Sequence, residues 1–253
     1  MQSARTRWWS VSASRIAVLA AVAATSLVAA APAGAAAPVV DQMVVFKSGS
    51  AKVGKVRASA TRVKIGRKRC AVGAGTPLAA LVRGKPGTLR FKDFGSCSSR
   101  ARDAGGLYVR GIGRDVISGP EDPDGWVYKV GNKAAPAGAA DPTGPFGRGL
   151  LRSRQRVTWF WCVSLQDEEG CQRTLELKVD GVATKEQIVH VAGYDNAGKG
   201  VPVEGATISS QAGSAGTTDS GGSAKLFLGA GVNTLVATKE GMVRSFPVRV
   251  NVP

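Results

Sequence analysis

The chain has 253 residues and a formal net charge of +16, because 34 Lys and Arg stand against 18 Asp and Glu. One histidine and four cysteines are present, which disfavours histidine-dependent catalysis and a zinc cluster. The excess charge is uneven: residues 38–180 hold 25 basic and 13 acidic residues, whereas residues 181–253 hold 6 and 5. The basic character therefore belongs to the first part of the mature chain.

Residues 1–37 have the pattern of a secretory signal peptide. Three arginines and no acidic residue accompany an apolar stretch at 16–31, and small residues at 33–35 offer a cleavage site. An uncleaved membrane anchor is the alternative, but the apolar run is short for a membrane span. We therefore expect a secreted protein, extracellular or associated with the cell wall, without a transmembrane anchor after cleavage.

The four cysteines lie in the mature chain, and an even number in an exported protein indicates disulfides. Three pairings are possible. Cys70–Cys97 and Cys162–Cys171 are favoured because each closes a local loop, and loop entropy assigns each bond roughly 3 to 3.5 kcal/mol. A zinc site is the alternative, but the cysteine spacing matches no zinc-finger pattern.

Residues 38–180 are expected to form a first domain, in which a mostly antiparallel sheet is crossed by one short helix. The helix is indicated by Thr76 as N-cap, Pro77 in the first turn, and Gly84 at its end. Residues 97–106 and 134–149 are predicted loops. The period-two patterns predict strands near 42–47, 60–66, 107–111, 125–130, 155–163 and 172–179.

Two of these strands contain every tryptophan beyond residue 9. Alternation places Trp126 and Tyr128 on one face of the first strand, and Trp159 and Trp161 on one face of the second. Most of these aromatic side chains are expected to fill the core of so small a domain. The alternative is that one face lines a groove for a small planar ligand, or meets another domain.

Three arginines alternate just before the second aromatic strand and would place guanidinium groups beside its rings, which suits anionic ring or sugar ligands. The basic residues also peak at 62–69. Outside a cell the natural polyanions are envelope polymers, acidic lipids and glycans, so nucleic acid is not expected as a partner. A solvated basic surface is the alternative. The candidate ligand-binding residues are Trp126, Tyr128, Trp159, Trp161, Arg152, Arg154 and Arg156.

No motif predicts a catalytic centre, a metal site or a cofactor. His190 lies in an apolar run and is expected on the polar face of a strand, and no Ser-His-Asp or Cys-His system can be assembled around it. Acidic clusters at 121–124 and 167–169 match no complete calcium loop and are predicted to be solvated turns. Asp219 is expected to form a turn.

Residues 181–253 are predicted to form a second domain, because the charge and composition both change near residue 180. Turns at 195–198, 218–222 and 239–241 separate short apolar runs, which is typical of an all-β sandwich. The predicted strands are 186–193, 201–209, 223–228, 232–238 and 243–252.

The run Gly125-Trp126-Val127-Tyr128-Lys129-Val130-Gly131-Asn132 resembles the hallmark of bacterial domains similar to the C-terminal domain of transcobalamin, although the family's closing Asn-Gly pair is reversed here. The segment 76–81 resembles the family's short helix, and the resemblance covers about residues 40–178. It implies a β-grasp-like α+β fold. In the vertebrate carriers this domain closes over a corrinoid, a step in which a large helical barrel also takes part.

The segments 200–208, 218–222 and 237–241 resemble carboxypeptidase-regulatory-like or bacterial immunoglobulin-like modules, over about 183–252. Such modules act as spacers, adhesion units or carbohydrate-binding-like sandwiches, so the resemblance implies a fold rather than a function. Together the sequence predicts an α+β domain followed by an all-β domain, in a secreted, basic, non-catalytic binding protein of the bacterial cell envelope. The alternatives are a corrinoid-type small-molecule carrier and a secreted protease inhibitor that presents the loop 134–149.

Overall fold

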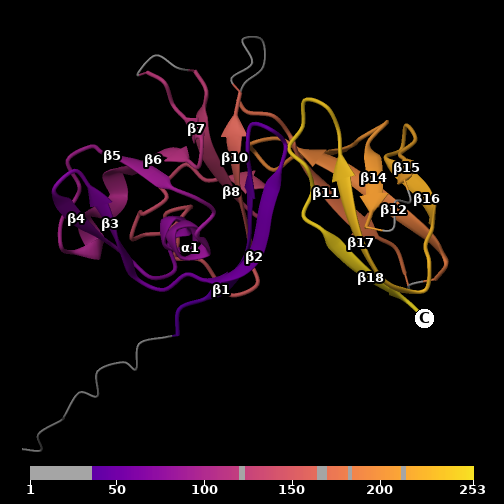
Figure 1. The fold of residues 1–253 in the computed structure, drawn as a ribbon, viewed down its shortest axis with the longest axis horizontal. Helices are drawn as coiled ribbons and strands as arrows, with labels where there is room; N and C mark the ends of the chain where they lie inside the picture. Colours follow the sequence, from indigo (N-terminus) through magenta and orange to yellow (C-terminus); the bar gives the residue numbers. More distant parts are fainter. Residues whose placement is uncertain (1–35, 120–122, 164–169, 182–183, 212–214) are drawn as a thin grey trace, which may run out of the picture. The chain divides into compact units, whose positions relative to one another are not determined.

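The computed structural model describes residues 36–119, 123–163, 170–181, 184–211 and 215–253 (Figure 1). Strands dominate these residues, as the sequence predicts, and the described helices are one short α-helix and one 3-10 helix. Most of the expected signal peptide lies outside the described residues. No helix of the described part is long and apolar enough to cross a bilayer.

A five-stranded sheet organises the N-terminal part of the described chain. In spatial order it contains β2 (Ala51–Arg57), β1 (Val39–Val45), β10 (Arg156–Cys162), β8 (Gly125–Val130) and β9 (Lys133–Ala134). β1 and β10 run parallel, and the other neighbours are antiparallel. The two predicted aromatic strands are neighbours, so Trp159 lies opposite Tyr128 and Trp161 opposite Trp126.

Helix α1 (Pro77–Gly84) packs against β1 and β2 and begins as the sequence predicts. The Thr76 hydroxyl accepts a hydrogen bond from the Ala79 N–H at 3.1 Å, which satisfies one of the free donors of the first turn. Its end differs from the prediction, because Lys85 and not Gly84 adopts the left-handed conformation (φ 47°). Gly84 is needed for space, since a Cβ there would lie 2.2 Å from Nε2 of the buried Gln42.

Two smaller sheets complete the N-terminal part (Figure 1). β3 (Thr61–Ile65) and β4 (Lys68–Val72) form a hairpin, and β5 (Leu89–Asp93), β6 (Leu107–Ile112) and β7 (Asp115–Val116) form a three-stranded sheet. The 3-10 helix η1 (Ala101–Gly106) leads into β6. Cys70 of β4 is bonded to Cys97 in the loop after β5, the pairing that the sequence favours. This bond ties the hairpin to the three-stranded sheet.

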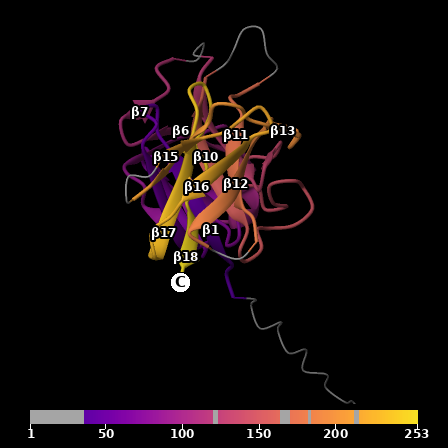
Figure 2. The same cartoon turned by 90° about the vertical axis from the view of Figure 1, so that its right-hand side faces the viewer.

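The C-terminal part consists of two four-stranded sheets that share one apolar core. The first contains β11 (Thr174–Val179), β12 (Glu186–Tyr194), β13 (Gly200–Pro202) and β16 (Ser223–Phe227). The second contains β15 (Ala215–Thr217), β14 (Thr207–Ser210), β17 (Gly231–Thr238) and β18 (Val248–Val252). Figure 2 shows β17 and β18 side by side in yellow.

Three strand predictions differ from the structure. The strand expected at 201–209 is divided into β13 and β14, which belong to different sheets. The strand expected at 172–179 in the first domain is β11, and it pairs with β12 of the C-terminal part, with Leu177 opposite Val191. The strand expected at 243–252 begins at Val248. Pro247 explains the late start, because proline has no N–H to donate to a sheet.

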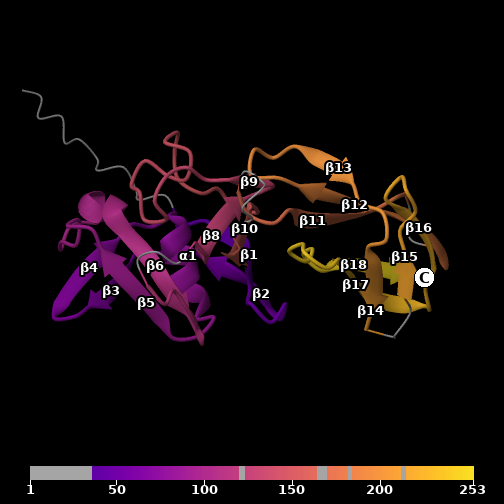
Figure 3. The same cartoon turned by 90° about the horizontal axis from the view of Figure 1, so that it is seen from above.

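Both faces of β10 are buried, which explains why both carry large side chains. Trp159 and Trp161 point into the core beneath α1. Phe160 points the other way, into a cluster with Met43 of β1 and Val243 of the C-terminal part. Residues 36–253 form one compact unit, and Figure 3 shows the sheet between α1 and the C-terminal strands. The second face of this strand therefore contacts another segment, and Phe160 also lines a cavity of about 380 Å³ beside that contact.

Candidate functional site

The four predicted aromatic site residues are core residues. Trp126, Tyr128, Trp159 and Trp161 are all less than a tenth exposed. Their rings contact one another, with Trp126 edge-on to Trp161 at a centroid distance of 5.8 Å and Tyr128 tilted over Trp159 at 5.1 Å. They therefore do not form an open stacking platform.

The three predicted arginines do not lie beside these tryptophans as expected. Arg152 and Arg154 are exposed in the turn before β10. Arg156 shares the strand face opposite to Trp159, because neighbouring residues of a strand alternate. Its guanidinium lies 3.7 Å from Glu176 and over the ring of Phe246 at 5.3 Å. The structure thus separates these three arginines from the aromatic core, whereas Lys47 places its Nζ 3.9 Å from the centre of the Trp161 ring.

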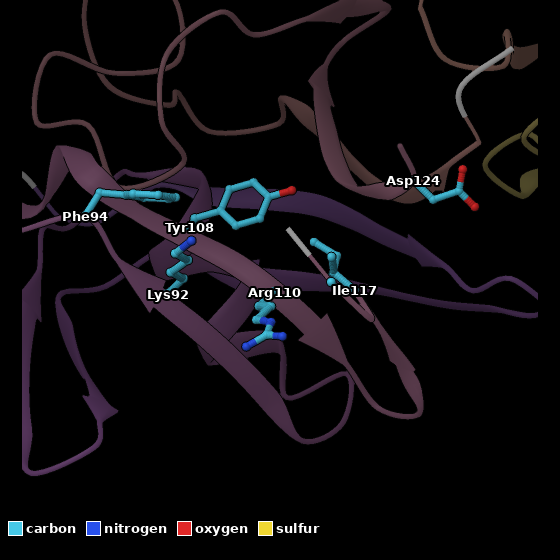
Figure 4. Close-up of a pocket in the computed structure, with 7 residues that line it drawn as sticks. Lys92, Phe94, Tyr108, Arg110, Ile117 and Asp124 are labelled. Atoms are coloured by element: carbon cyan, nitrogen blue, oxygen red, sulfur yellow. The ribbon is translucent and has the colours of Figure 1, made fainter. Parts of the chain in front are cut away.

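A different aromatic and basic surface lies on the outer face of β5 and β6. A cavity of about 380 Å³, here called the outer groove, opens on this face (Figure 4). Figure 4 shows Phe94 and Tyr108 side by side at one end, with Ile117 and Asp124 at the other. The residues that line the outer groove are Lys92, Phe94, Tyr108, Arg110, Ile117, Gly119 and Asp124.

Strand alternation produces this surface. Lys92 of β5 lies directly opposite Tyr108 of β6, and Arg110 follows two residues later on the same face. Between them Leu107 and Val109 point into the core and hold β6 in place. Two neighbouring segments therefore each carry one aromatic ring and one cation on this face: Lys92 and Phe94 on the first, and Tyr108 and Arg110 on the second.

Phe94 is the most exposed ring of the outer groove, with 64 % of its surface accessible, and Tyr108 is 38 % exposed. Their ring centroids are 6.4 Å apart in an edge-on arrangement, and Lys92 Nζ lies 4.6 Å above the Phe94 ring. Gly125 gives Tyr108 its room, because a Cβ at that position would lie 2.9 Å from the Tyr108 hydroxyl. An exposed ring of this size on a folded surface is a candidate contact for a ligand.

The backbone around Phe94 is held by hydrogen bonds to the side chain of Asp93 and by a disulfide at Cys97. Asp93 Oδ1 accepts hydrogen bonds from the N–H groups of Gly95, Ser96 and Cys97 at 2.8 to 3.0 Å. Burial would raise the pKa of Asp93, but the hydrogen bonds from Cys97 and Ser96 and the nearby Lys68 outweigh it, so the pKa lies below its ordinary value. Together with the Cys70–Cys97 bond, this turn fixes Phe94 in its exposed position.

The cluster of basic residues at 62–69 lies next to the outer groove. Lys68, at the start of β4, places its Nζ 3.4 Å from Asp93 Oδ2, one residue from both Lys92 and Phe94. Lys64 and Arg69 are exposed and directly opposite each other on the hairpin. A long anionic ligand bound in the outer groove could therefore also contact these basic side chains.

Sequence reasoning missed the outer groove for an identifiable reason. β5 alternates Leu89, Phe91 and Asp93 with Arg90 and Lys92, and none of the sequence predictions includes it. Without β5, the Tyr108 and Arg110 positions of the predicted strand 107–111 had no visible partner. The pattern of Lys92 with Phe94 and of Tyr108 with Arg110, each two residues apart, is the signal that was available.

Asp180, His190 and Ser223 form a hydrogen-bonded row, whereas the sequence predicts no Ser-His-Asp system with a credible catalytic context. His190 Nε2 lies 2.7 Å from Asp180 Oδ2, and His190 Nδ1 lies 2.8 Å from Ser223 Oγ. The Asp180 and His190 side chains are 60 % and 44 % exposed, whereas the aspartate of a catalytic triad is buried. The row is explained by cross-strand pairing of His190 with Ser223.

The other acidic residues give no metal site within the described part of the chain. Glu121, Asp122 and residues 167–169 lie outside the described residues, and among the rest no group of three or more His, Cys, Asp or Glu could hold a metal ion. Asp124 Oδ2 accepts a hydrogen bond from Trp161 Nε1 at 3.2 Å. Asp219 forms the predicted turn, because its Oδ1 accepts from the N–H groups of Gly221 and Ser223.

The predicted loop 134–149 is tied to the core at several points. Tyr128 donates its hydroxyl hydrogen to the Ala137 carbonyl at 2.7 Å, and the Leu78 N–H donates to the Ala139 carbonyl at 2.8 Å. The second disulfide, Cys162–Cys171, also has the favoured pairing.

Comparisons of the chain with protein-family models, with curated proteins and with solved structures found no match.

Proposed function

We propose that this protein is a secreted, non-catalytic binding protein of the bacterial cell envelope, and that the outer groove recognises anionic glycans or anionic envelope polymers. The observation that carries the proposal is the exposed ring of Phe94 beside Tyr108, with Lys92 and Arg110 on the same strand face. The ring is held by a disulfide-linked turn rather than by burial. Held in this position beside a second ring, Phe94 is available for contact with a ligand.

The chemistry of the outer groove suits an acidic sugar. Aromatic faces cover the apolar faces of sugar rings, while Lys92 and Arg110 can pair with carboxylate, sulfate or phosphate groups. Asp124 at the far end of the outer groove can accept hydrogen bonds from sugar hydroxyl groups. The net charge of +12 carried by residues 38–180 would also speed the approach of a polyanion.

The proposal includes the finer fold assignments. A β-grasp-like arrangement for residues 38–180 is supported by the parallel pairing of the first strand, β1, with β10, by the hairpin partner β2 on the other edge of β1, and by α1 across the sheet. An immunoglobulin-like sandwich for the C-terminal part is supported by two sheets with one shared core, and its first strand, β11 (Thr174–Val179), precedes the boundary expected at residue 181. In this arrangement the second module acts as a spacer.

Replacement of the exposed ring tests the proposal. We expect Phe94→Ala to weaken binding to polygalacturonate or to a sulfated glycan roughly three- to tenfold at fixed salt, since one aromatic contact contributes about 0.5–1.5 kcal/mol. Binding is measured by calorimetry or by affinity electrophoresis. Phe227→Ala is the matched control, because Phe227 is 69 % exposed with Lys225 Nζ 5.6 Å from its ring centre but lies on β16. The control is expected to bind like the wild type.

Salt dependence separates recognition from bulk charge. Lys92→Gln with Arg110→Gln is expected to lower both the affinity and its dependence on salt, whereas Phe94→Ala leaves the salt dependence unchanged. If Phe94→Ala binds as well as the wild type, and all binding disappears at moderate salt, the outer groove is not a recognition site. Dextran serves as the uncharged polymer in the same assay.

A further inference from the structure

β2 is the longest strand at a sheet edge in the described part of the chain. It has seven residues and pairs only with β1, whereas the other edge strands have six residues or fewer. Figure 3 shows β2 at one edge of the five-stranded sheet, with β9 at the other. A free edge presents unpaired backbone groups to which another chain can pair. No residue of β2 lines the outer groove, so the two sites are independent.

The hydrogen-bond pattern of the β1–β2 pair shows which groups of β2 face outward. The Ala58 N–H, just after β2, donates to the Pro38 carbonyl at 2.8 Å. Bonded pairs alternate along an antiparallel ladder, so the even-numbered residues of β2 bond to β1 and the odd-numbered residues turn their N–H and C=O groups away from it. Within the described residues, these outward groups of Val53 and Lys55 have no hydrogen-bond partner, and both residues are exposed.

Gly54, between these two residues, is not required by the fold. The register with β1 continues through it without a bulge, and its φ lies outside the left-handed region. A Cβ at this position would meet nothing within 4 Å. Glycine inside a strand lowers stability and often marks a place where another backbone comes close, and an aromatic side chain of a neighbouring strand can cover it. Gly54 therefore leaves room for a large side chain of an added strand.

The charges along β2 favour an acidic partner. Lys52, Lys55 and Arg57 are basic, and β2 contains no acidic residue. Asp41 of β1 pairs with Lys55 at 2.8 Å, whereas no salt bridge joins Lys52 or Arg57 to a carboxylate of the described residues. Pairing of this edge with a second copy of itself would bring like charges together, which is unfavourable, while an acidic strand would place opposite charges across the pair.

We propose that the free edge of β2 binds an extended acidic peptide segment of another protein by antiparallel strand addition, with an aromatic side chain of that segment over Gly54. Main-chain hydrogen bonds to Val53 and Lys55 hold the segment, and its side chains provide specificity. The probe is the acetylated and amidated peptide Glu-Val-Glu-Phe-Val-Glu-Thr. Its residues lie opposite Arg57 through Ala51 in turn, which places glutamate opposite each basic residue and valine opposite Val53.

Backbone methylation of the peptide separates strand addition from attraction by charge. The third and fifth peptide residues lie opposite Lys55 and Val53 and turn their N–H groups toward β2, whereas the fourth and sixth turn theirs away. Methyl groups on the third and fifth nitrogens are expected to weaken binding about tenfold, because two hydrogen bonds are lost. Methyl groups on the fourth and sixth give the matched control, which has the same charge and composition and is expected to bind like the unmodified peptide.

Amide signals of the ¹⁵N-labelled protein locate the bound peptide. We expect the N–H signals of Val53 and Lys55 to shift downfield in a saturable way, and those of Lys52 and Gly54, which already face β1, to move much less. Lys52→Glu is expected to weaken binding about two- to fivefold. Lys185→Glu makes the same change of net charge at an exposed lysine of the C-terminal part and is expected to have no effect.

Equal binding of the two methylated peptides, or unmoved signals of Val53 and Lys55, would overturn the proposal. The basic residues of β2 would then only prevent unwanted pairing at this edge. The proposal is also wrong if these two N–H groups are protected from hydrogen exchange in the free protein, and more strongly at higher protein concentration. That result would assign the edge to a second copy of the chain.

Discussion

Lys129 carries an ammonium group into the interior, on the face of β8 opposite to Trp126 and Tyr128. The side chain is fully buried, and its Nζ donates to the carbonyl groups of Tyr194 and Asp195, both at 2.9 Å, and to Thr174 Oγ1 at 3.3 Å. Burial lowers the pKa of Lys129 to about 8, although the nearby Asp195 opposes the shift. The neutral amine retains two N–H donors for the two carbonyl groups, so the contact survives deprotonation.

The lowered pKa predicts how stability changes with pH. Between about pH 8 and pH 10.5 the folded protein has released the Lys129 proton and the unfolded chain still binds it, so the free energy of unfolding rises across this window. Below about pH 8 the lysine is charged in both the folded and the unfolded state, so it causes no change of stability with pH there. We expect the free energy of unfolding of the wild type, relative to that of Lys129→Met, to be about 1–3 kcal/mol higher at pH 10 than at pH 7.5. Urea unfolding at the two pH values measures this difference.

Lys133→Met provides the control, because Lys133 is an exposed lysine of β9. Its pH dependence is expected to follow that of the wild type. Comparison of variants removes the contribution of the tyrosines, which also titrate at high pH. An unchanged pH profile in Lys129→Met would show that Lys129 is not the group responsible.

At the scale of the element, α1 depends on its cap and on tertiary packing. Eight residues are too few for a stable isolated helix in water. Thr76 is fully buried, accepts from the Ala79 N–H and donates to the Gly73 carbonyl at 2.9 Å. Thr76→Ala is expected to lower the free energy of unfolding by about 1–2 kcal/mol, measured by chemical denaturation.

Thr76→Ser tests whether the hydroxyl is responsible, because it keeps both hydrogen bonds and removes one methyl group. We expect it to lose less than half of the stability lost by Thr76→Ala. Equal losses in the two variants would assign the effect to packing of the methyl group instead. In either case the variant leaves the outer groove intact, because Thr76 does not line it.

For the whole molecule, the junction between the five-stranded sheet and the C-terminal sheets is the decisive feature. Val243 is buried with Met43 and Phe160 of the sheet. Val243→Asp would bury a charge without a partner there, so we expect a loss of about 3 kcal/mol or more and separate unfolding of the two parts. Val232→Asp is the control, since Val232 is 66 % exposed on β17.

Two probes distinguish joint from separate unfolding. The described tryptophans all lie in the five-stranded sheet, so their fluorescence reports on the N-terminal part, whereas far-ultraviolet circular dichroism reports on both parts. The two denaturation curves of the wild type are expected to coincide and those of Val243→Asp to differ. Curves that differ already in the wild type would show that the junction does not couple the parts.

The accuracy of the sequence predictions followed the strength of the local signal. The helix from Thr76 and Pro77 has a cap and an apolar face, and the strands around Trp126 and Trp159 alternate clearly, so these elements were found. β2 and β5 were missed because they are weakly patterned and acquire their structure from neighbours. Arg156 was expected beside Trp159, although alternation along the strand already places it on the opposite face. Only its contacts with Glu176 and Phe246 required the tertiary structure.

The sequence by itself determined the β-rich character, the helix start and the alternation of the aromatic strands, because each of these depends on residues close together in the chain. It favoured, but did not fix, the disulfide pairing that the structure contains. Only the tertiary structure decided which aromatic rings are exposed. Trp126 and Trp159 are buried because both faces of their sheet are covered, whereas Phe94 is exposed because a turn closed by Cys97 and Asp93 holds it outward. The outer groove depends on contacts between β5, β6 and the segment that carries Asp124, which no local pattern encodes.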